Sequence, residues 1–463
     1  MENMDKRATF GSRMGAVLAA AGSAVGLGNI WRFPCETGAH GGAAFILLYI
    51  GFIMTVAVPV LICEMALGRK SRTNCHATFR RLSDSREVSV SRPLAFLFYL
   101  TGAMCVLAGF MLLSYYSVVA GWTLGYTASA GVGGMMGMTV EETGKAFAEF
   151  SSDPVVPVVW LVAFVIITAA ITVMGVQKGI ERGSKIMMPV LFILLIVLAV
   201  CSLSLPDASK GLEFLFCPDF SKITTDVALS AMGQAFFTLS VGIGCLMTYA
   251  SYFSNEENIV KDAFNIAAID TMVAIVAGII IFPAAMSVGI NPDAGPSLVF
   301  ITLPNVFNQA FGATPWLCYI VTLLFYLLLT MAALTSSISM LEITTAFVSE
   351  RFGIRRRNAV AGIGLATCLA GFACSMSFGE WSGVTVSGMG IFDLFDFFVA
   401  KFAMPVGAIF MCLLMRKFGE KEVVRMLTND GRIDLRRFPE VFYFLVSWVI
   451  PVLILVIFVN ELL

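Results

Sequence analysis

The stretch AGSAVGLGNIWRFP, residues 21–34, decides the fold of this chain. It lies in an apolar run, yet it contains three glycines, an asparagine and an arginine. Glycine weakens a helix interior by about 1 kcal/mol relative to alanine. Unpaired backbone groups are tolerated at membrane depth only where protein or a cavity surrounds them. The stretch therefore predicts a helix broken beside an internal cavity, although close helix packing is the simpler explanation for a lone glycine pair.

Composition places the chain in a membrane. Hydrophobic residues make up 58% of the 463 positions, charged residues only 13%, and mean hydropathy is +0.87. Apolar runs long enough to cross a hydrocarbon core of about 30 Å are centred near residues 23, 55, 110, 165, 193, 240, 275, 330, 367, 403 and 450. We predict an all-α polytopic membrane protein with eleven spanning helices.

Charge placement orients these helices, because short cytoplasmic loops carry the excess of Lys and Arg. With the N-terminus inside, 25 of the 30 basic residues fall on the cytoplasmic side. The C-terminus is then outside, and we expect a multi-pass protein of the inner (plasma) membrane. An intramembrane enzyme would need a nucleophile with a base, or a metal cluster. The sequence offers neither pattern, so we do not expect an enzyme.

A second stretch, GQAFFTLSVGIGCLMTY at residues 233–249, repeats the glycine pattern in the sixth predicted helix. Helix six comes five spans after helix one, and because five is odd the two helices cross the membrane in opposite directions. Glycine-broken helices at corresponding positions of two inverted halves indicate a binding site near the middle of the membrane.

Several motifs together resemble the neurotransmitter:sodium symporter family, in its bacterial, amino-acid-transporting, eleven-helix branch. They are GSAVGLGNIWRFP, GGAAFILLYI, EMALGR, GQAFFTLS, TYASY, LVFITLP and LTSSIS. The resemblance implies a 5+5 inverted-repeat transporter fold with discontinuous helices 1 and 6. Residues 1–205 would form the first repeat, 206–420 the second, and 421–463 a cytoplasmic loop with helix 11. It also implies sodium-coupled uptake by alternating access, with an amino-acid substrate and the lipid bilayer as partners and no nucleic acid; the oligomeric state stays open.

The resemblance implies two sodium sites. The first would take Ala24, Asn29, Thr238 and Asp270, and the second would take Gly22, Val25, Ala332, Thr335 and Ser336. The spacing of the last three residues supports the second site, since positions i, i+3 and i+4 share one helix face. The alternative is that these hydroxyls bond only to carbonyls of their own helix.

Asp270 departs from much of the family, which has Asn at this position. A carboxylate inside a span is costly and is a functional-site hypothesis by default. Chloride-dependent relatives carry a Ser one helical turn later, where this chain has Ala274. We therefore expect Asp270 to supply the fixed negative charge, and transport to be independent of chloride.

The organic substrate should lie between the two broken helices. The positive end of a half-helix suits a carboxylate, and exposed carbonyls suit an ammonium group. An apolar lining without an acidic residue favours a neutral, hydrophobic or aromatic L-amino acid. The residues expected to bind it are Ala24, Leu27, Gly28, Leu112, Tyr116, Phe237, Thr238, Ser240, Ile243, Ser337 and Met340.

The resemblance also implies two gates. On the outside Arg32 should face Asp396, over a lid of Phe237 and Tyr116. On the inside Arg7 should pair with Glu350, with Tyr252 beside them. For each pair the alternative is a solvated interfacial charge worth under about 1 kcal/mol.

Two further elements should support these movements. Glu64 is expected to cap free amides of the broken helices. Gly179 and Pro189 should let the cytoplasmic end of helix 5 unwind. A nontransporting amino-acid sensor or a sodium-permeable channel on the same fold is the alternative function.

Overall fold

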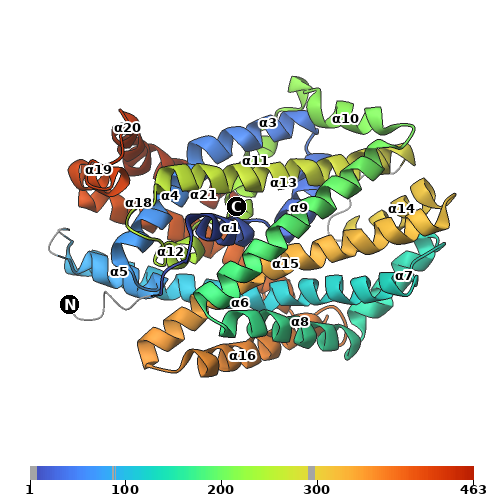
Figure 1. The fold of residues 1–463 in the computed structure, drawn as a ribbon, viewed down its shortest axis with the longest axis horizontal. Helices are drawn as coiled ribbons and strands as arrows, with labels where there is room; N and C mark the ends of the chain where they lie inside the picture. The colour runs from blue at the N-terminus through green and yellow to red at the C-terminus, as the bar shows by residue number, and fades with distance from the viewer. Residues whose placement is uncertain (1–7, 86–87, 89, 290–297, 463) are drawn as a thin grey trace.

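The computed structural model describes residues 8–85, 88, 90–289 and 298–462, and these residues are largely helical. Within those ranges the only β pairing is a single bridge between Val386 and Met389. Figure 1 shows long helices running roughly along the longest axis of the molecule, with α7, α10 and α14 near one end and α5, α19 and α20 near the other. The all-helical fold class predicted from the sequence is confirmed.

The first half of the chain is built of nine α-helices and three π-helical turns. In chain order these elements are α1 (Arg13–Ala24), η2 (Gly28–Arg32), α2 (Phe33–Ala39), α3 (Ala43–Phe52), η3 (Ile53–Ala57), α4 (Val58–Ser71), α5 (Cys75–Ser83), α6 (Arg92–Gly131), α7 (Val140–Ser152), α8 (Val156–Val173), η4 (Val176–Glu181) and α9 (Arg182–Leu203).

Among the described residues, the second half continues with three helices of more than 20 residues and with several shorter ones. Its elements are α10 (Ala208–Phe216), η5 (Phe220–Lys222), α11 (Thr225–Thr238), α12 (Cys245–Ala250), α13 (Ile259–Ser287), η6 (Leu298–Thr302), α14 (Leu303–Phe311), α15 (Pro315–Phe352), α16 (Arg356–Met376), α17 (Ile391–Asp396), η7 (Phe397–Ala403), α18 (Met404–Phe418), α19 (Glu420–Thr428), α20 (Phe438–Phe444), η8 (Leu445–Val449) and α21 (Ile450–Leu462).

Nine helical stretches among the described residues are long and apolar enough to cross a membrane. A tenth span is made by α1 with the helix over Gly28–Ala39, which are bent by 53° at their break. The sixth predicted helix corresponds to α11 and α12, two shorter helices separated by residues 239–244, which are not among these ten spans. Both predicted breaks are therefore present.

Helix α1 lies inside the bundle, in contact with α9, α13 and α15 (Figure 1). Its sequence RMGAVLAAAGSA is made almost entirely of small residues, and Ser12 caps its first turn by accepting the Gly15 N–H at 3.1 Å. The small residues let neighbours approach closely. A Cβ on Gly15 would lie 2.2 Å from Glu181, so this position has no room for a side chain.

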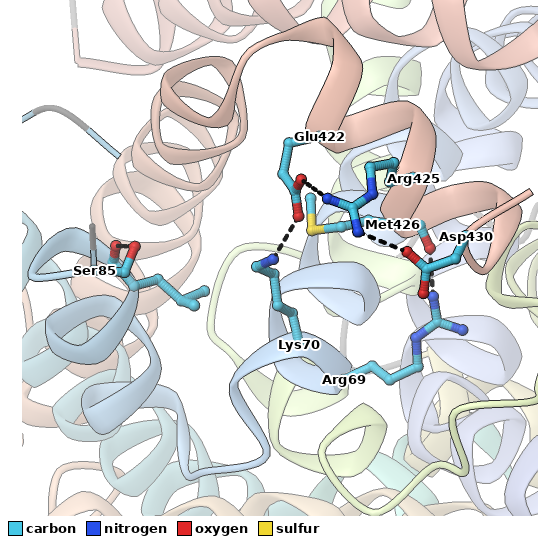
Figure 2. Close-up of polar contacts among 8 residues, drawn as sticks. Arg69, Lys70, Ser85, Glu422, Arg425, Met426 and Asp430 are labelled. Atoms are coloured by element: carbon cyan, nitrogen blue, oxygen red, sulfur yellow. Dashed lines mark hydrogen bonds and ion pairs between the residues drawn. The ribbon is translucent and has the colours of Figure 1, made fainter. Parts of the chain in front are cut away.

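At one end of the bundle, α19 is fastened to the end of α4 (Figure 2). Lys70 and Arg425 both pair with Glu422, at 2.7 and 3.2 Å. Arg69, which is buried, donates to the main-chain carbonyls of Met426 and Glu257. Arg69 of α4 therefore joins α19 to the loop that follows α12, and α12 is the second half of the broken helix.

Candidate functional site

The break after α1 is held open by one side chain of its own second half, Asn29, and by one from α6, Tyr116. Helix α1 ends at Ala24, and Val25 has an extended conformation with ψ of 112°. The Asn29 side-chain oxygen accepts the Gly26 N–H at 2.9 Å, and the Tyr116 hydroxyl accepts the Leu27 N–H at 3.2 Å. The helix resumes as the π-helical turn Gly28–Arg32, a feature common at functional sites.

Gly26 leaves room at this break for side chains of neighbouring helices. A Cβ there would lie 2.5 Å from the Ser336 Oγ and 2.9 Å from the Tyr116 hydroxyl. Neither Gly26 nor Gly28 has a positive φ. The glycines of the opening stretch therefore let α6 and α15 approach the free backbone, and they are not required for a left-handed conformation.

The break between α11 and α12 has a different basis. Ser240, Gly242 and Gly244 have φ values of 50°, 95° and 79°. Left-handed conformations are costly for residues with a side chain and readily adopted by glycine. A Cβ on Gly242 would also lie 2.2 Å from the Met404 carbonyl oxygen. In this helix glycine is needed both for conformation and for close approach.

Glu64 of α4 supports the second break. Its carboxylate is fully buried and accepts the N–H groups of Gly242 and Met247 at 3.1 and 3.2 Å. These amides belong to the broken segment and to the first turn of α12. A buried donor left without a partner costs about 1–3 kcal/mol, so Glu64 stabilises the interrupted helix.

The residues of the second candidate sodium site lie together. The hydroxyls of Thr335 and Ser336 on α15 donate to the Val25 carbonyl at 3.3 and 2.9 Å. Ser336 also approaches the Gly22 carbonyl at 3.5 Å, and Thr335 approaches the Ala332 carbonyl of its own helix at 2.9 Å. The bonds to the broken helix and within α15 therefore coexist, and they place several oxygen atoms around one point.

The polar residues of the first candidate site form a second buried cluster. The Asn29 side-chain amide donates to the Asp270 carboxylate at 2.7 Å and to the Thr238 hydroxyl at 3.0 Å. The Thr238 hydroxyl in turn donates to the other carboxylate oxygen at 2.9 Å. Asp270 is fully buried. Asn29 and Thr238, which hydrogen-bond its carboxylate, are both neutral donors.

A central cavity of about 30 Å³ lies between the two breaks. Its lining consists of Ala24, Gly26, Leu27, Gly28, Leu112, Tyr116, Phe237, Thr238, Ser240, Ser336, Met340 and Met404. Nine of the eleven residues predicted to bind substrate are among them. The other two, Ile243 and Ser337, lie outside this lining: Ile243 is fully buried elsewhere in the core, and Ser337 bonds back to the Ala333 carbonyl at 2.8 Å.

Three lining residues were not among the predicted substrate ligands: Gly26 and Met404, and Ser336, which was expected only in the second sodium site. Gly26 and Ser336 line the cavity because they lie next to each other at the break: a Cβ on Gly26 would lie 2.5 Å from the Ser336 Oγ. Met404 comes from the start of α18, which no local motif connects with the breaks.

Comparison with known proteins agrees with this arrangement. The profile of the Sodium:neurotransmitter symporter family matches residues 7–133 and 152–463. The chain belongs to this family.

Individual relatives match over nearly their whole length. An uncharacterized sodium-dependent transporter of Bacillus subtilis, YhdH, is 36% identical over 457 residues, with 98% of both chains covered. A sodium-dependent transporter of Haemophilus influenzae is 32% identical, with 99% of both chains covered. The crystal structure of MhsT in complex with L-phenylalanine superimposes with a TM-score of 0.87 at 38% identity, covering 98% of this chain and all of MhsT. The protein is therefore a sodium-coupled membrane transporter and not an enzyme.

A second cavity, named the outer cavity after the gate predicted there, holds the predicted outer-gate residues in a different arrangement. Arg32, Phe237 and Asp396 line one cavity. The Arg32 guanidinium lies over the Phe237 ring, 4.3 Å from its centroid, and its ion pair is with Glu36 at 3.9 Å. The predicted pair with Asp396 is therefore not formed here, because Glu36 lies one turn away on the same helix. Phe237 also lines the central cavity, so it separates the two spaces, and Tyr116 faces the central one.

The described residues include two members of the predicted inner gate, Glu350 and Tyr252. Arg7 lies outside the described residues. Glu350 accepts the main-chain and side-chain N–H groups of Asn74 at 3.1 and 2.7 Å. Tyr252 donates to the Glu342 carboxylate at 2.7 Å. Its place beside Arg7 and Glu350 stays a prediction, because Arg7 is not among the described residues.

The Glu342 carboxylate was overlooked, although its signal was present in the sequence. It is fully buried and pairs with Arg356 of α16. An acidic residue within the apolar run SISMLEITTAF marks a partnered charge. The sequence analysis named Glu350 as a gate residue and did not consider Glu342.

The fifth predicted helix, which consists of η4 and α9, is not unwound at its start in this structure. Gly179 lies in the π-helical turn Val176–Glu181, and Pro189 lies inside α9. Glu181 holds the segment before α1, accepting the Gly11 N–H at 2.6 Å and the Ser12 hydroxyl at 2.9 Å. Helix 5 and the N-terminal segment are therefore joined at the end where unwinding is expected.

Proposed function

We propose that this symporter takes up a neutral, hydrophobic or aromatic L-amino acid with two sodium ions by alternating access, without a requirement for chloride. The observation that carries this proposal is the meeting of two interrupted helices at one buried cavity. Main-chain N–H and C=O groups freed at both breaks surround that cavity. Such groups can bind the two charged ends of a zwitterion and a hard cation.

Two clusters of oxygen atoms support two cation sites. One gathers carbonyls of Gly22 and Val25 with hydroxyls of α15, and the other gathers Asn29, Thr238 and Asp270. Two sodium ions moving inward through 100 mV and a tenfold gradient release about 7 kcal/mol. That energy supports an amino-acid gradient of about 10⁵-fold.

The lining of the central cavity favours the substrate class. None of its residues is acidic, and Leu112, Phe237 and Met340 supply apolar surface. A monoamine, with a lone ammonium group, would require a carboxylate partner there. The Tyr116 hydroxyl, which accepts the Leu27 N–H, can donate its own proton to a substrate carboxylate. MhsT, which has a similar fold and sequence, is in complex with L-phenylalanine.

Independence of chloride is inferred from the residues at positions 270 and 274. Asp270 supplies a fixed charge next to the first sodium site, and Ala274 offers no hydroxyl one turn later. A permanent carboxylate can balance the sodium charge that a bound anion balances elsewhere in the family. The proposed topology has residues 1–205 and 206–420 as inverted repeats in the plasma membrane, with the N-terminus cytoplasmic and the C-terminus outside.

Uptake by proteoliposomes tests this function directly. The purified protein should accumulate labelled phenylalanine or leucine above the external concentration when sodium is outside, and potassium should not replace sodium. Uptake should increase with an inside-negative potential and persist when gluconate replaces chloride. Sodium-dependent binding without accumulation would indicate a sensor, and sodium current without amino-acid coupling would indicate a channel. Either result would overturn the proposal.

A further inference from the structure

Glu36 occupies a position that the two gates do not explain. It lies on α2, one turn beyond Arg32, and its side chain is mostly buried. One carboxylate oxygen accepts the Ser230 hydroxyl of α11 at 2.7 Å. The other lies 3.9 Å from the Arg32 Nε. Glu36 therefore bridges the outer halves of both broken helices and also approaches the gate arginine.

A third contact fixes the position of this carboxylate. The Nδ1 of His40 lies 2.9 Å from the Glu36 main-chain carbonyl and 3.3 Å from its carboxylate. Ser230 and His40 both contact the same carboxylate oxygen, Oε2, and together they restrain Glu36 with its other oxygen, Oε1, nearest Arg32. Its carboxylate is a fixed point beside a long and flexible cation.

Arg32 has a second carboxylate within the same outer cavity. Asp396, at the end of α17, lines that cavity together with Arg32 and Phe237. The guanidinium lies over the Phe237 ring, between the central and outer cavities, and 36% of its side chain is exposed. A single arginine thus lies between one carboxylate on its own helix and another on a different helix.

We propose that Glu36 is the alternative partner of Arg32, which exchanges between Glu36 when the outer gate is unpaired and Asp396 when it is closed. This inference rests on the proposed function, since it assigns a positioning role within that transport cycle. Glu36 lowers the cost of opening because Arg32 leaves Asp396 for another carboxylate. Ser230 keeps Glu36 in place and joins α2 to α11, so that the two outer half-helices move together.

The exchange predicts opposite effects for its two carboxylates. Without Glu36 the arginine has only Asp396 to pair with, and the outer cavity should close more often. Without Asp396 it should stay with Glu36, and the cavity should open more often. Ion pairs at half-exposed positions shift equilibria by about two- to five-fold, and we expect effects of that size.

Accessibility of the outer cavity measures this equilibrium without requiring transport. The reporter is Ala400→Cys, which lines the outer cavity, in a background where Cys35 and Cys217 are replaced by Ser. The rate of labelling with a membrane-impermeant maleimide should fall about two- to five-fold in Glu36→Gln. It should rise by a similar factor in Asp396→Asn and return close to the parental rate in the double variant.

Further variants separate exchange from simple structural damage. Ser230→Ala keeps the Glu36 charge but removes its anchor, so it should lower the labelling rate in the same direction and by less. In an Arg32→Gln background, Glu36→Gln should leave the labelling rate unchanged. Thermal unfolding midpoints of all variants identify any that are misfolded, and Glu36→Asp should restore part of the parental rate.

Two results would overturn the inference. One is an unchanged labelling rate in well-folded Glu36→Gln. The other is a fall of the same size when Glu36→Gln is introduced in the Arg32→Gln background. Because labelling does not depend on amino-acid uptake, failure of the transport assay with a normal labelling pattern would reject the proposed function and leave the exchange supported.

Discussion

Replacing Asp270 by Asn tests the assignment of the first sodium site most directly. The substitution preserves shape and leaves one oxygen in place, while it removes the charge. In the structure the two carboxylate oxygens accept hydrogen bonds from Asn29 and Thr238, the other side chains of the proposed site. An asparagine oxygen can keep one of these bonds, so the variant should fold.

The size of the effect follows from the charge removed. At about 4 Å and an effective dielectric constant near 20, a cation and a carboxylate attract by about 4 kcal/mol. Part of this is offset, because the asparagine dipole still ligates sodium and the variant no longer keeps a charge away from water. We expect a net loss of about 1.4–3 kcal/mol, which is about 10- to 150-fold weaker sodium binding.

Sodium titration of labelled phenylalanine binding in detergent measures this loss, once with chloride and once with gluconate. The unmodified protein should give the same sodium affinity in both salts. The Asp270→Asn variant should need more sodium, and chloride should recover part of the difference. Asp226→Asn, an exposed substitution of the same type in α11, is the matched control. Unchanged sodium affinity in a folded Asp270→Asn protein, or strict chloride dependence of the unmodified protein, would refute the reasoning.

Three other predictions follow from the described contacts. Replacing Thr335 and Ser336 by Ala should weaken sodium binding at least tenfold with little change in the unfolding midpoint, and an unchanged sodium titration would remove both from the site. Glu64→Ala should lower the free energy of unfolding by about 2–6 kcal/mol by leaving two buried amides unpaired. In thermal denaturation the midpoint of Glu64→Gln should lie between those of Glu64→Ala and the unmodified protein. Equal midpoints for all three proteins would contradict the capping role. Burial raises the pKa of Glu257, in the loop after α12, from 4.5 to about 7, so the folded state holds an extra proton between these values. Stability should therefore fall by up to about 3 kcal/mol as pH rises through this window, and midpoints measured from pH 4.5 to 8 should lose this decline in Glu257→Gln.

The membrane fold and the two breaks could be predicted because their signals are local. Hydropathy fixes which segments span, and glycine pairs inside apolar runs mark where the backbone is interrupted. The reason for the glycines was only partly accessible, however. Gly26 is required by the Ser336 and Tyr116 side chains of other helices, whereas Gly242 adopts a left-handed conformation. A sequence does not distinguish these two causes, because the first depends on tertiary contacts.

Partners of long charged side chains were the least predictable part of the site. Arg32 was assigned to Asp396 and pairs with Glu36 at 3.9 Å. Asp396 lines the same cavity as Arg32, so two carboxylates are available to one guanidinium. The choice depends on distances of a few ångströms and on the conformation, which the residue pattern does not contain. The oxygen clusters around Val25 and Asp270 agree better with expectation, because short side chains on packed helices have few alternatives.

Helix 1 connects every part of the proposed mechanism. Its carbonyls at Gly22 and Val25 contribute to one candidate sodium site, and Asn29 contributes to the other. At its first turn Ser12 is held by Glu181, and Arg13 pairs with Asp262 at 2.8 Å. A sodium ion at the Gly22 and Val25 carbonyls and the contacts of Ser12 and Arg13 therefore act on the same half of this helix, whereas Asn29 lies beyond the break. By linkage, any preference of sodium for one position of α1 must equally change how readily these end contacts open, and this coupling requires no separate pathway between the sites and the gate.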